Sequence, residues 1–281
     1  MTLVRFALIT LIIICLVSCH YQKVASIDKL NIVPFEYKAL TSDKNIRGSV
    51  LIYDLNKDKY YSNDFNWAKI GRIPASTYKI PHSLIALELG IVEYSDSLLK
   101  WNGESRYLQI WEQDLTFKQA FTYSCVPCYQ EIAHKVGVER MNNYIEKLNF
   151  GQMDIGSDNI DNFWLVGNSK ISQFEAIDFL KRLYLSELPI SKRTEQIFKE
   201  LIIVKQTDEL LDDYTLRAKT GLSVSNKSYN GWYIGYIETP SNVYFFATNI
   251  SPTKKYDKSF NDKRKNITIR ALRQLGLDTI K

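Results

Sequence analysis

Residues 74–90 read PASTYKIPHSLIALELG and show the start, body and end of one helix. Pro74 precedes the helical pattern, and Gly90 ends it as a C-terminal cap, because glycine adopts a left-handed backbone without strain. We therefore expect a helix over residues 77–89, with Ser76 at its N-terminal end. It opens a long helical stretch between two groups of strands, and that division decides the fold.

Strand patterns lie on both sides of the helical stretch. Ahead of it, residues 48–54 (GSVLIYD) read as a buried strand and residues 59–62 as its hairpin partner. Beyond it, strands are expected again, at 214–220, 231–238 and 242–250. Further helices are expected at 114–122, 127–136, 139–148 and 264–275, and after a capping box that runs from Ser172 to Glu175.

This order of strands, helices, strands and a final helix predicts an α+β fold. One lobe is an antiparallel sheet flanked by terminal helices, built from about residues 28–74 and 213–281. The other lobe, about residues 75–212, is all-helical. Both lobes form one domain over residues 28–281 of the 281-residue chain. A cleft between two such lobes is a natural substrate site.

The composition is that of a folded, weakly basic protein. Hydrophobic residues make up 45% and aromatic residues 13%, which argues against disorder. The net charge is +5, and the basic cluster near the C-terminus is interrupted by Asp257 and Asp262. A solvated approach to the last helix explains that cluster better than nucleic-acid binding, so we expect no nucleic-acid partner.

The N-terminus has the features of an export signal. Arg5 supplies a positive charge, and the apolar run 6–17 is shorter than the ~20 residues of a transmembrane helix. Leu16-Val17-Ser18-Cys19 resembles a bacterial lipobox, in which residues 1–18 are removed and Cys19 is lipidated. The alternative is an ordinary cleaved signal. We expect an exported, periplasmic protein, anchored to the membrane by a lipid on Cys19.

Cys125 and Cys128 form a C-x-x-C pair in a helical region. A thioredoxin-like centre is disfavoured because no strand leads into the motif. Zinc is disfavoured because there is no second pair and the chain has only three histidines. The pair is therefore either two buried small side chains or a local disulfide. No metal is expected.

Ser76-Thr77-Tyr78-Lys79 is an S-x-x-K motif. The i, i+3 spacing places the hydroxyl and the amine on one helix face. A serine becomes a good nucleophile when a neighbouring base takes its proton. Lys79 can be that base only as something other than an ammonium, which requires desolvation or chemical modification.

Lys219-Thr220-Gly221 lies at the expected end of a strand, before a loop over residues 222–230. A cation, a hydroxyl and a glycine at a strand end can hold a substrate carboxylate while the backbone comes close. Each of the two motifs is weak evidence alone. Together and in this order, they match the motif set of serine β-lactamases and penicillin-binding proteins.

Further segments make the chain resemble the class D, or oxacillinase-type, serine β-lactamases. The resemblance spans residues 48–277. The matching segments are Ser124-Cys125-Val126 for S-x-V, Phe150-Gly151-Gln152 for Y-G-N, residues 161–167 (DNFWLVG) for F-W-L-x-G, Gly231-Trp232-Tyr233 for the G-W pair after K-T-G, and residues 264–268 (RKNIT) for the start of the last helix. Phe150 and Gln152 depart from Y-G-N, so we assign Phe150 no acid role and treat that segment as structural.

The resemblance implies hydrolysis of β-lactam antibiotics, and so resistance to them, through an acyl-enzyme on Ser76. The backbone N–H groups of Ser76 and Leu222 are expected to form the oxyanion hole. Ser124 is expected to relay a proton to the departing lactam nitrogen. The expected carboxylate-binding residues are Lys219, Thr220, Gly221 and Arg264.

In this family the S-x-x-K lysine reacts with CO2, so Lys79 is expected as an N6-carboxylysine that acts as general base. CO2 or bicarbonate supplies that group, and no other cofactor is expected. Val126, Leu165 and Trp164 would form an apolar pocket that disfavours the ammonium, and the Trp164 indole N–H can donate to the carboxylate. Taken singly, Trp164 could be a core aromatic, Ser124 a helix cap and Arg264 a surface charge.

Two other functions compete with hydrolysis. A β-lactam sensor shares the fold, the serine and the lysine but keeps its acyl group, and it carries membrane segments ahead of the domain. A penicillin-binding protein acts on cell-wall peptide, and the S-x-V and tryptophan segments disfavour it. The substrate spectrum and the oligomeric state do not follow from the sequence.

Overall fold

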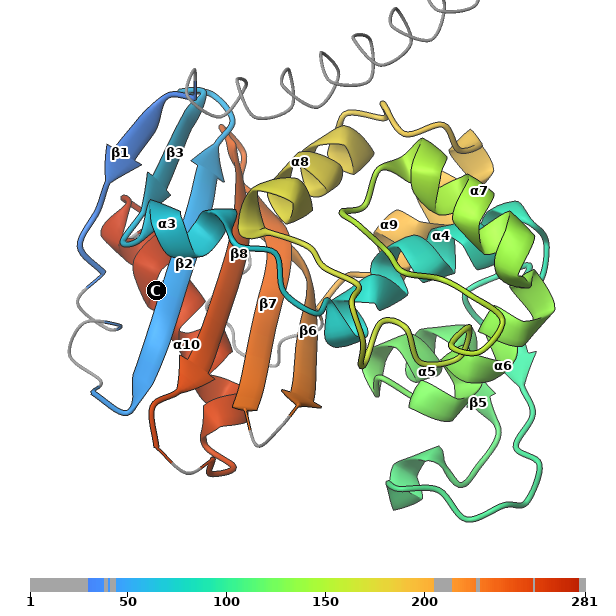
Figure 1. Cartoon of the computed structure of the whole chain (residues 1–281). Coiled ribbons are helices and arrows are strands. Elements are labelled where there is room, and N and C mark those ends of the chain that lie inside the picture. The colour runs from blue at the N-terminus through green and yellow to red at the C-terminus, as the bar shows by residue number, and fades with distance from the viewer. Residues whose placement is uncertain are drawn as a thin grey trace, which may run out of the picture.

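The structure is a computed structural model that describes residues 30–37, 40, 44–204, 214–225, 228–254 and 256–277. Figure 1 shows a sheet lobe and a helical lobe side by side, so the predicted α+β fold is confirmed. The expected export signal over residues 1–18, Cys19 and the start of the predicted domain at residue 28 lie outside the described residues.

Within the described residues, one sheet has six strands in the order β1-β3-β2-β8-β7-β6. Their bounds are β1 (Ile32–Pro34), β2 (Ile46–Asp54), β3 (Lys59–Ser62), β6 (Thr215–Ser225), β7 (Ser228–Glu238) and β8 (Val243–Pro252). Neighbouring strands are antiparallel except β1, which runs parallel to β3. The antiparallel sheet that the sequence predicts is therefore present except at this edge, where no hairpin joins β1 to its neighbour and the two strands run parallel.

Both faces of the sheet are covered, because its central strands are apolar almost without a break and successive side chains point to opposite faces: Leu51 and Tyr53 join one hydrophobic cluster, and Val50 and Ile52 join the other. On one face lies the C-terminal helix α10 (Phe260–Gln274). On the other lie α3 (Phe65–Lys69) and α8 (Gln173–Tyr184). The Tyr184 ring of α8 lies 5.7 Å from the Phe245 ring of β8. Thus α8 packs on the sheet, although it falls within residues 75–212, which were expected to form the separate helical lobe.

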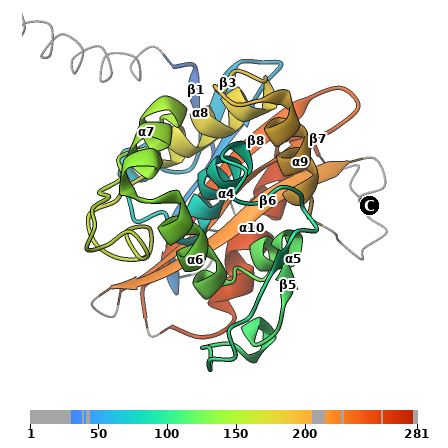
Figure 2. The same cartoon turned by 90° about the vertical axis from the view of Figure 1, so that its right-hand side faces the viewer.

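The helical lobe surrounds one buried helix, α4 (Lys79–Glu88), which lies at the centre of Figure 2. Every residue of α4 from Lys79 to Leu87 is buried. The other elements of the lobe are η2 (Ala75–Tyr78), β4 (Leu98–Leu99), η3 (Gln109–Trp111), β5 (Leu115–Thr116), α5 (Phe117–Thr122), α6 (Val126–Val136), α7 (Val138–Leu148) and α9 (Lys192–Leu201). The helix predicted over residues 77–89 is thus present, but its first turn is the 3-10 helix η2.

Three other expected boundaries are wrong. Helix α10 begins at Phe260 and not at residue 264, so Arg264 lies in its second turn. Strand β6 continues past Thr220 to Ser225, because it pairs with β7 along its whole length. Lys219-Thr220-Gly221 therefore lies within a strand, and the loop expected over residues 222–230 is mostly strand. The helix expected from residue 114 begins at Phe117, because Leu115 and Thr116 pair with β4 and Thr116 then caps α5.

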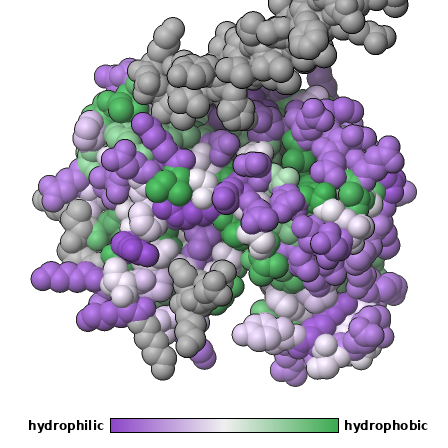
Figure 3. Space-filling view, viewed as in Figure 1, coloured by the Kyte–Doolittle hydropathy of each residue, from purple (hydrophilic) through white to green (hydrophobic). Residues whose placement is uncertain are grey.

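The surface between the lobes is hollowed along the lower edge of the view in Figure 3. The ends of β6 and β7 and the helices α5 and α6 flank this side in Figure 1. Across the ranges that the structure describes, no helix combines the length and the apolar character needed to cross a membrane.

Candidate active site

Ser76 lies in η2, where the chain passes from the sheet lobe into α4. Ala75 immediately before it has a φ of 51°, which is unusual for a residue other than glycine and marks a sharp turn. The Thr77 hydroxyl donates to the Pro74 carbonyl at 2.6 Å and closes this turn. The turn leaves Ser76 8% exposed, so its hydroxyl is largely shielded from water.

Two side chains of β7 fix the segment ahead of the nucleophile. The Trp232 indole donates to the Ile73 carbonyl at 2.8 Å, and the Asn230 amide donates to the same oxygen at 2.9 Å. Gly221 of β6 packs directly against the turn, because a Cβ there would lie 3.0 Å from the Pro74 carbonyl oxygen. The sheet lobe thus holds the turn that carries Ser76 from two sides.

Lys79 lies one turn after Ser76, with its Nζ 3.4 Å from the Ser76 Oγ. The side chain is fully buried, and its Nζ lies 4.7 Å from the centre of the Tyr129 ring. Burial lowers the pKa of Lys79 to about 7, because a dry environment disfavours the ammonium. A large share of Lys79 is therefore a neutral amine near neutral pH. This form has the lone pair that a base for Ser76 needs.

Ser124 lies between α5 and α6 with a φ of 53°, in the left-handed region. The Lys219 Nζ donates to its hydroxyl. Burial, followed by the positive charges of Lys79, Arg264 and Lys265, holds the pKa of Lys219 well below its usual range. Ser124 does not cap the next helix, since the Cys125 sulfur fills that role. The structure therefore joins S-x-V to K-T-G through one hydrogen bond.

Arg264 is 7% exposed and is not a surface charge. Its Nη1 donates to the Gly221 carbonyl, and its Nε donates to the Asn261 carbonyl at 3.0 Å. Burial lowers the pKa of Arg264 to about 10. The guanidinium thus lies beside K-T-G, with Thr220 and Leu222 as the neighbours of Gly221 in β6. Thr220 pairs with Tyr233 and Leu222 with Gly231 in the sheet.

Trp164 is fully buried beside the nucleophile helix. Its ring stacks on Tyr78, with centres 5.9 Å apart, and lies 5.5 Å from His82. Its Nε1 is buried and has no hydrogen-bond partner among the described residues. Val126 and Leu165 are partly buried against the same hydrophobic cluster. An indole N–H without a partner inside an apolar pocket is available to donate to a buried acceptor.

The segment Phe150-Gly151-Gln152 is structural, as expected. Phe150 is fully buried and meets Phe179 edge to face, with ring centres 4.8 Å apart. Gln152 and Lys170 exchange backbone hydrogen bonds of 2.8 and 2.7 Å. Phe150 supplies packing and has no polar atom in its side chain to offer a substrate.

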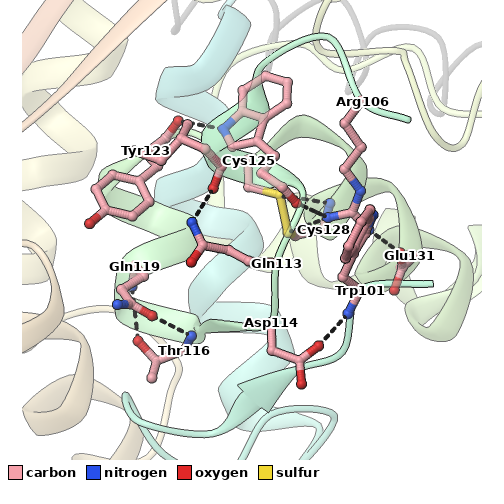
Figure 4. The surroundings of a disulfide bond; sticks show 12 residues. Trp101, Arg106, Gln113, Asp114, Thr116, Gln119, Tyr123, Cys125, Cys128 and Glu131 are labelled. Carbon is pink, nitrogen blue, oxygen red and sulfur yellow. Dashed lines mark hydrogen bonds and ion pairs between the residues drawn. A yellow bond between two sulfur atoms is a disulfide. The ribbon is translucent and has the colours of Figure 1, made fainter. Parts of the chain in front are cut away.

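Cys125 and Cys128 form a disulfide next to Ser124, which settles the alternative that the sequence left open. Figure 4 shows the Arg106 guanidinium beside the sulfur atoms, at 3.9 Å from Cys125 and 3.7 Å from Cys128. Arg106 also pairs with Glu131 at 3.3 Å. No group of three potential metal ligands occurs in the part of the chain that the structure describes.

Sequence reasoning missed His82 and Tyr129, which both touch the surroundings of Lys79. Their rings lie 5.2 Å apart, and the Tyr129 hydroxyl pairs with Ser83 at 2.6 Å. Both look like core residues in the sequence. The i, i+3 spacing of Lys79 and His82 on one helix was the only available signal.

Comparisons with known proteins identify the family of the chain. The family described as "Penicillin binding protein transpeptidase domain" matches residues 45–272. Beta-lactamase OXA-48 of Klebsiella pneumoniae is 38% identical over 214 residues, which are 76% of this chain and 79% of that protein. The crystal structure of a class D β-lactamase from Nostoc is 40% identical, with a TM-score of 0.77, and the match covers 83% of this chain and 95% of that one.

A second kind of neighbour shares the fold. The C-terminal domain of the Bacillus licheniformis BlaR penicillin receptor is 26% identical, with a TM-score of 0.79, over 89% of this chain and 98% of that domain. Its identity is lower than that of the two β-lactamases. The chain belongs to the class D β-lactamases, serine hydrolases of a cyclic amide bond that share the penicillin-binding transpeptidase fold.

Proposed function

We propose that the protein hydrolyses β-lactam antibiotics through an acyl-enzyme on Ser76, and thereby confers resistance. The observation that carries the proposal is the buried Lys79 amine, 3.4 Å from the Ser76 hydroxyl and with a lowered pKa. A base of this kind can take the serine proton as the hydroxyl attacks the lactam carbonyl. The buried turn around Ser76 keeps the reacting atoms away from bulk water.

Carboxylation of Lys79 would replace the amine with an anionic oxygen base. The neutral amine adds to the carbon of CO2: one N–C bond forms, and one C–O π bond opens, which places the negative charge on oxygen. One proton leaves the nitrogen and passes to water. The resulting carboxylate supplies a base for both acylation and deacylation. A buried anion needs hydrogen-bond donors, and the unpartnered Trp164 indole N–H supports this assignment. Val126 and Leu165 supply apolar walls that disfavour the ammonium.

The remaining residues have roles in proton transfer, oxyanion stabilisation and carboxylate binding. Ser124, which accepts from Lys219, would pass a proton to the lactam nitrogen when the C–N bond breaks. The backbone N–H groups of Ser76 and Leu222 would stabilise the developing oxyanion. Arg264 and Lys219, together with Thr220 and Gly221, would hold the substrate carboxylate, and an anion bound there favours the charged form of Lys219.

The test is penicillin hydrolysis by purified protein in CO2-depleted buffer, before and after bicarbonate is added. We expect depletion to remove most activity and bicarbonate to restore it. Trp164→Ala should raise the bicarbonate concentration needed. Lys79→Ala should acylate slowly and then remain an acyl-enzyme visible by mass spectrometry. Full turnover without CO2, unchanged by bicarbonate, would leave Ser76 as nucleophile but would reject the carboxylated lysine.

A β-lactam sensor is the second candidate, and the likeness to the BlaR receptor domain favours it. A sensor keeps its acyl group, whereas a hydrolase releases it many times. Steady turnover of penicillin therefore supports the hydrolase, and a single stoichiometric burst supports the sensor. A penicillin-binding protein would in addition act on cell-wall peptide.

We also propose that the protein is exported and anchored by a lipid on Cys19, on the evidence of the N-terminal sequence alone. Membrane fractionation of the wild type and of Cys19→Ala tests this. The wild type should sediment with membranes and the variant should not. A wholly soluble wild type would reject the lipid anchor but not the export signal.

A further inference from the structure

His82 is a buried polar residue that the proposed chemistry does not yet use. It is fully buried, and neither Nδ1 nor Nε2 has a hydrogen-bond partner among the described residues. Buried polar side chains nearly always have a partner, because an unpaired one forfeits the hydrogen bonds it made with water. A ring with both nitrogens unpaired inside a well-packed helix therefore requires an explanation.

The position of His82 supplies one. It lies three residues after Lys79 on α4, and helical side chains lean toward the N-terminus, so the imidazole leans over the turn that carries Lys79. The two side chains share their surroundings. The Tyr129 ring lies 5.2 Å from the His82 ring and 4.7 Å from the Lys79 Nζ. The Trp164 ring, with its own unpaired N–H, lies 5.5 Å from His82.

The electrostatics agree with this proximity. Burial, and then the positive charge of Lys79, lowers the pKa of His82 to about 3. The ring is therefore neutral and keeps one N–H to donate. When a carboxylate forms on the Lys79 amine, a negative charge lies next to His82, and donation from the ring becomes favourable.

We propose that His82 donates its N–H to the carboxylate on Lys79, beside the Trp164 indole, and so helps to hold CO2 on the lysine. This rests on the carboxylated lysine proposed above. A carboxylate can accept several hydrogen bonds, and one indole N–H leaves most of that capacity unused. His82 does not face the β-lactam itself. It is a positioning residue that acts through Lys79.

The experiment compares wild type, His82→Leu and His82→Asn. Leucine keeps an apolar volume without a donor, and asparagine keeps a short donor. Ser83→Ala is the matched control on the same turn, because it removes one buried hydroxyl, which pairs with Tyr129, and leaves the His82 imidazole in place. Each purified protein is depleted of CO2 and titrated with 13C-labelled bicarbonate. The carbamate carbon is followed by 13C NMR and penicillin hydrolysis is followed in parallel, with a thermal melt of each variant to establish folding.

Loss of a hydrogen bond to a charged group should raise the half-saturating bicarbonate concentration of His82→Leu by about tenfold or more. At saturating bicarbonate its kcat should recover to within about twofold of wild type, as expected for a residue that acts on the resting lysine. His82→Asn should lie between the two, and Ser83→Ala should keep the wild-type half-saturation even if it melts earlier.

Two negative results are distinguishable. A clear carbamate signal in wild type, with the same half-saturation in folded His82→Leu, overturns the role of His82 and leaves the carboxylated lysine intact. Absence of a carbamate signal in wild type overturns both. If His82→Leu does not fold, the test rests on His82→Asn. A half-saturating bicarbonate concentration and a carbamate signal that both equal those of wild type in His82→Asn count against the proposal.

Discussion

Gly221→Ala probes the contact between β6 and the turn that carries Ser76. The added Cβ would lie 3.0 Å from the Pro74 carbonyl oxygen, 3.1 Å from the Thr77 Cγ2 and 3.3 Å from the Thr77 nitrogen. Two of these three atoms are backbone, and the turn cannot retreat, because Trp232 and Asn230 hold the preceding Ile73 carbonyl. The strand and the turn must therefore separate by a few tenths of an ångström.

The size of the effect follows from that displacement. A 1 Å misplacement costs about a hundredfold in rate, so a few tenths of an ångström should lower kcat roughly fourfold to tenfold. Crowding of this kind also costs about 1–3 kcal/mol of unfolding free energy. Gly71→Ala is the control, because its Cβ would meet the Lys170 Cβ at 3.0 Å, an equally close contact that involves neither β6 nor the turn from Pro74 to Thr77.

Penicillin hydrolysis and thermal melts of both variants make the comparison. Both should melt earlier than wild type, but only Gly221→Ala should lose kcat. If Gly221→Ala keeps the wild-type kcat while its melting temperature falls, the close contact stabilises the fold without setting the geometry of the oxyanion site, and the reasoning is refuted.

Three further predictions address charge, pH and the disulfide. Arg264→Ala should lower kcat/KM about tenfold to a hundredfold, because it removes a charge-assisted hydrogen bond to the substrate carboxylate. An unchanged kcat/KM would exclude Arg264 from carboxylate binding. Since burial lowers the pKa of Lys79 to about 7, kcat/KM should fall as the pH falls through that value, and a flat profile there would count against Lys79 as base. Between this pKa and its usual value the unfolded chain binds the extra proton, so Lys79 should make the unfolding free energy rise with pH over that window. Replacing both Cys125 and Cys128 with serine should cost about 2 kcal/mol of unfolding free energy, because the bond closes only a short loop. Chemical denaturation measures that cost, and no change would mean that the bond leaves the unfolded chain unconstrained.

The motifs of the site could be read from the sequence because each is local. S-x-x-K needs only one helical turn, and K-T-G only one strand, so Ser76, Lys79 and Lys219 were identifiable without a fold. The contact between Ser124 and Lys219 was predictable only through the family resemblance, since it joins segments far apart in the chain.

Features that depend on packing were not predictable. The continuation of β6 beyond Thr220 depends on its pairing with β7. Helix α9 was missed because its sequence, KRTEQIFKEL, is mostly polar and buries few side chains. The left-handed backbone at Ala75 and Ser124 runs against the preference of both residue types, and only the surrounding contacts impose it.

The two hydrogen bonds to the Ile73 carbonyl have a consequence for how a substrate enters. Trp232 and Asn230 belong to the sheet lobe, and Ile73 leads into the helix at the centre of the other lobe. A hinge motion that moved the lobes apart would stretch the hydrogen bonds from Trp232 and Asn230 to Ile73, because they join the two lobes. Substrate entry should therefore depend on side chains and loops at the rim of a rigid slot, and product release should not wait for a slow opening of the whole molecule.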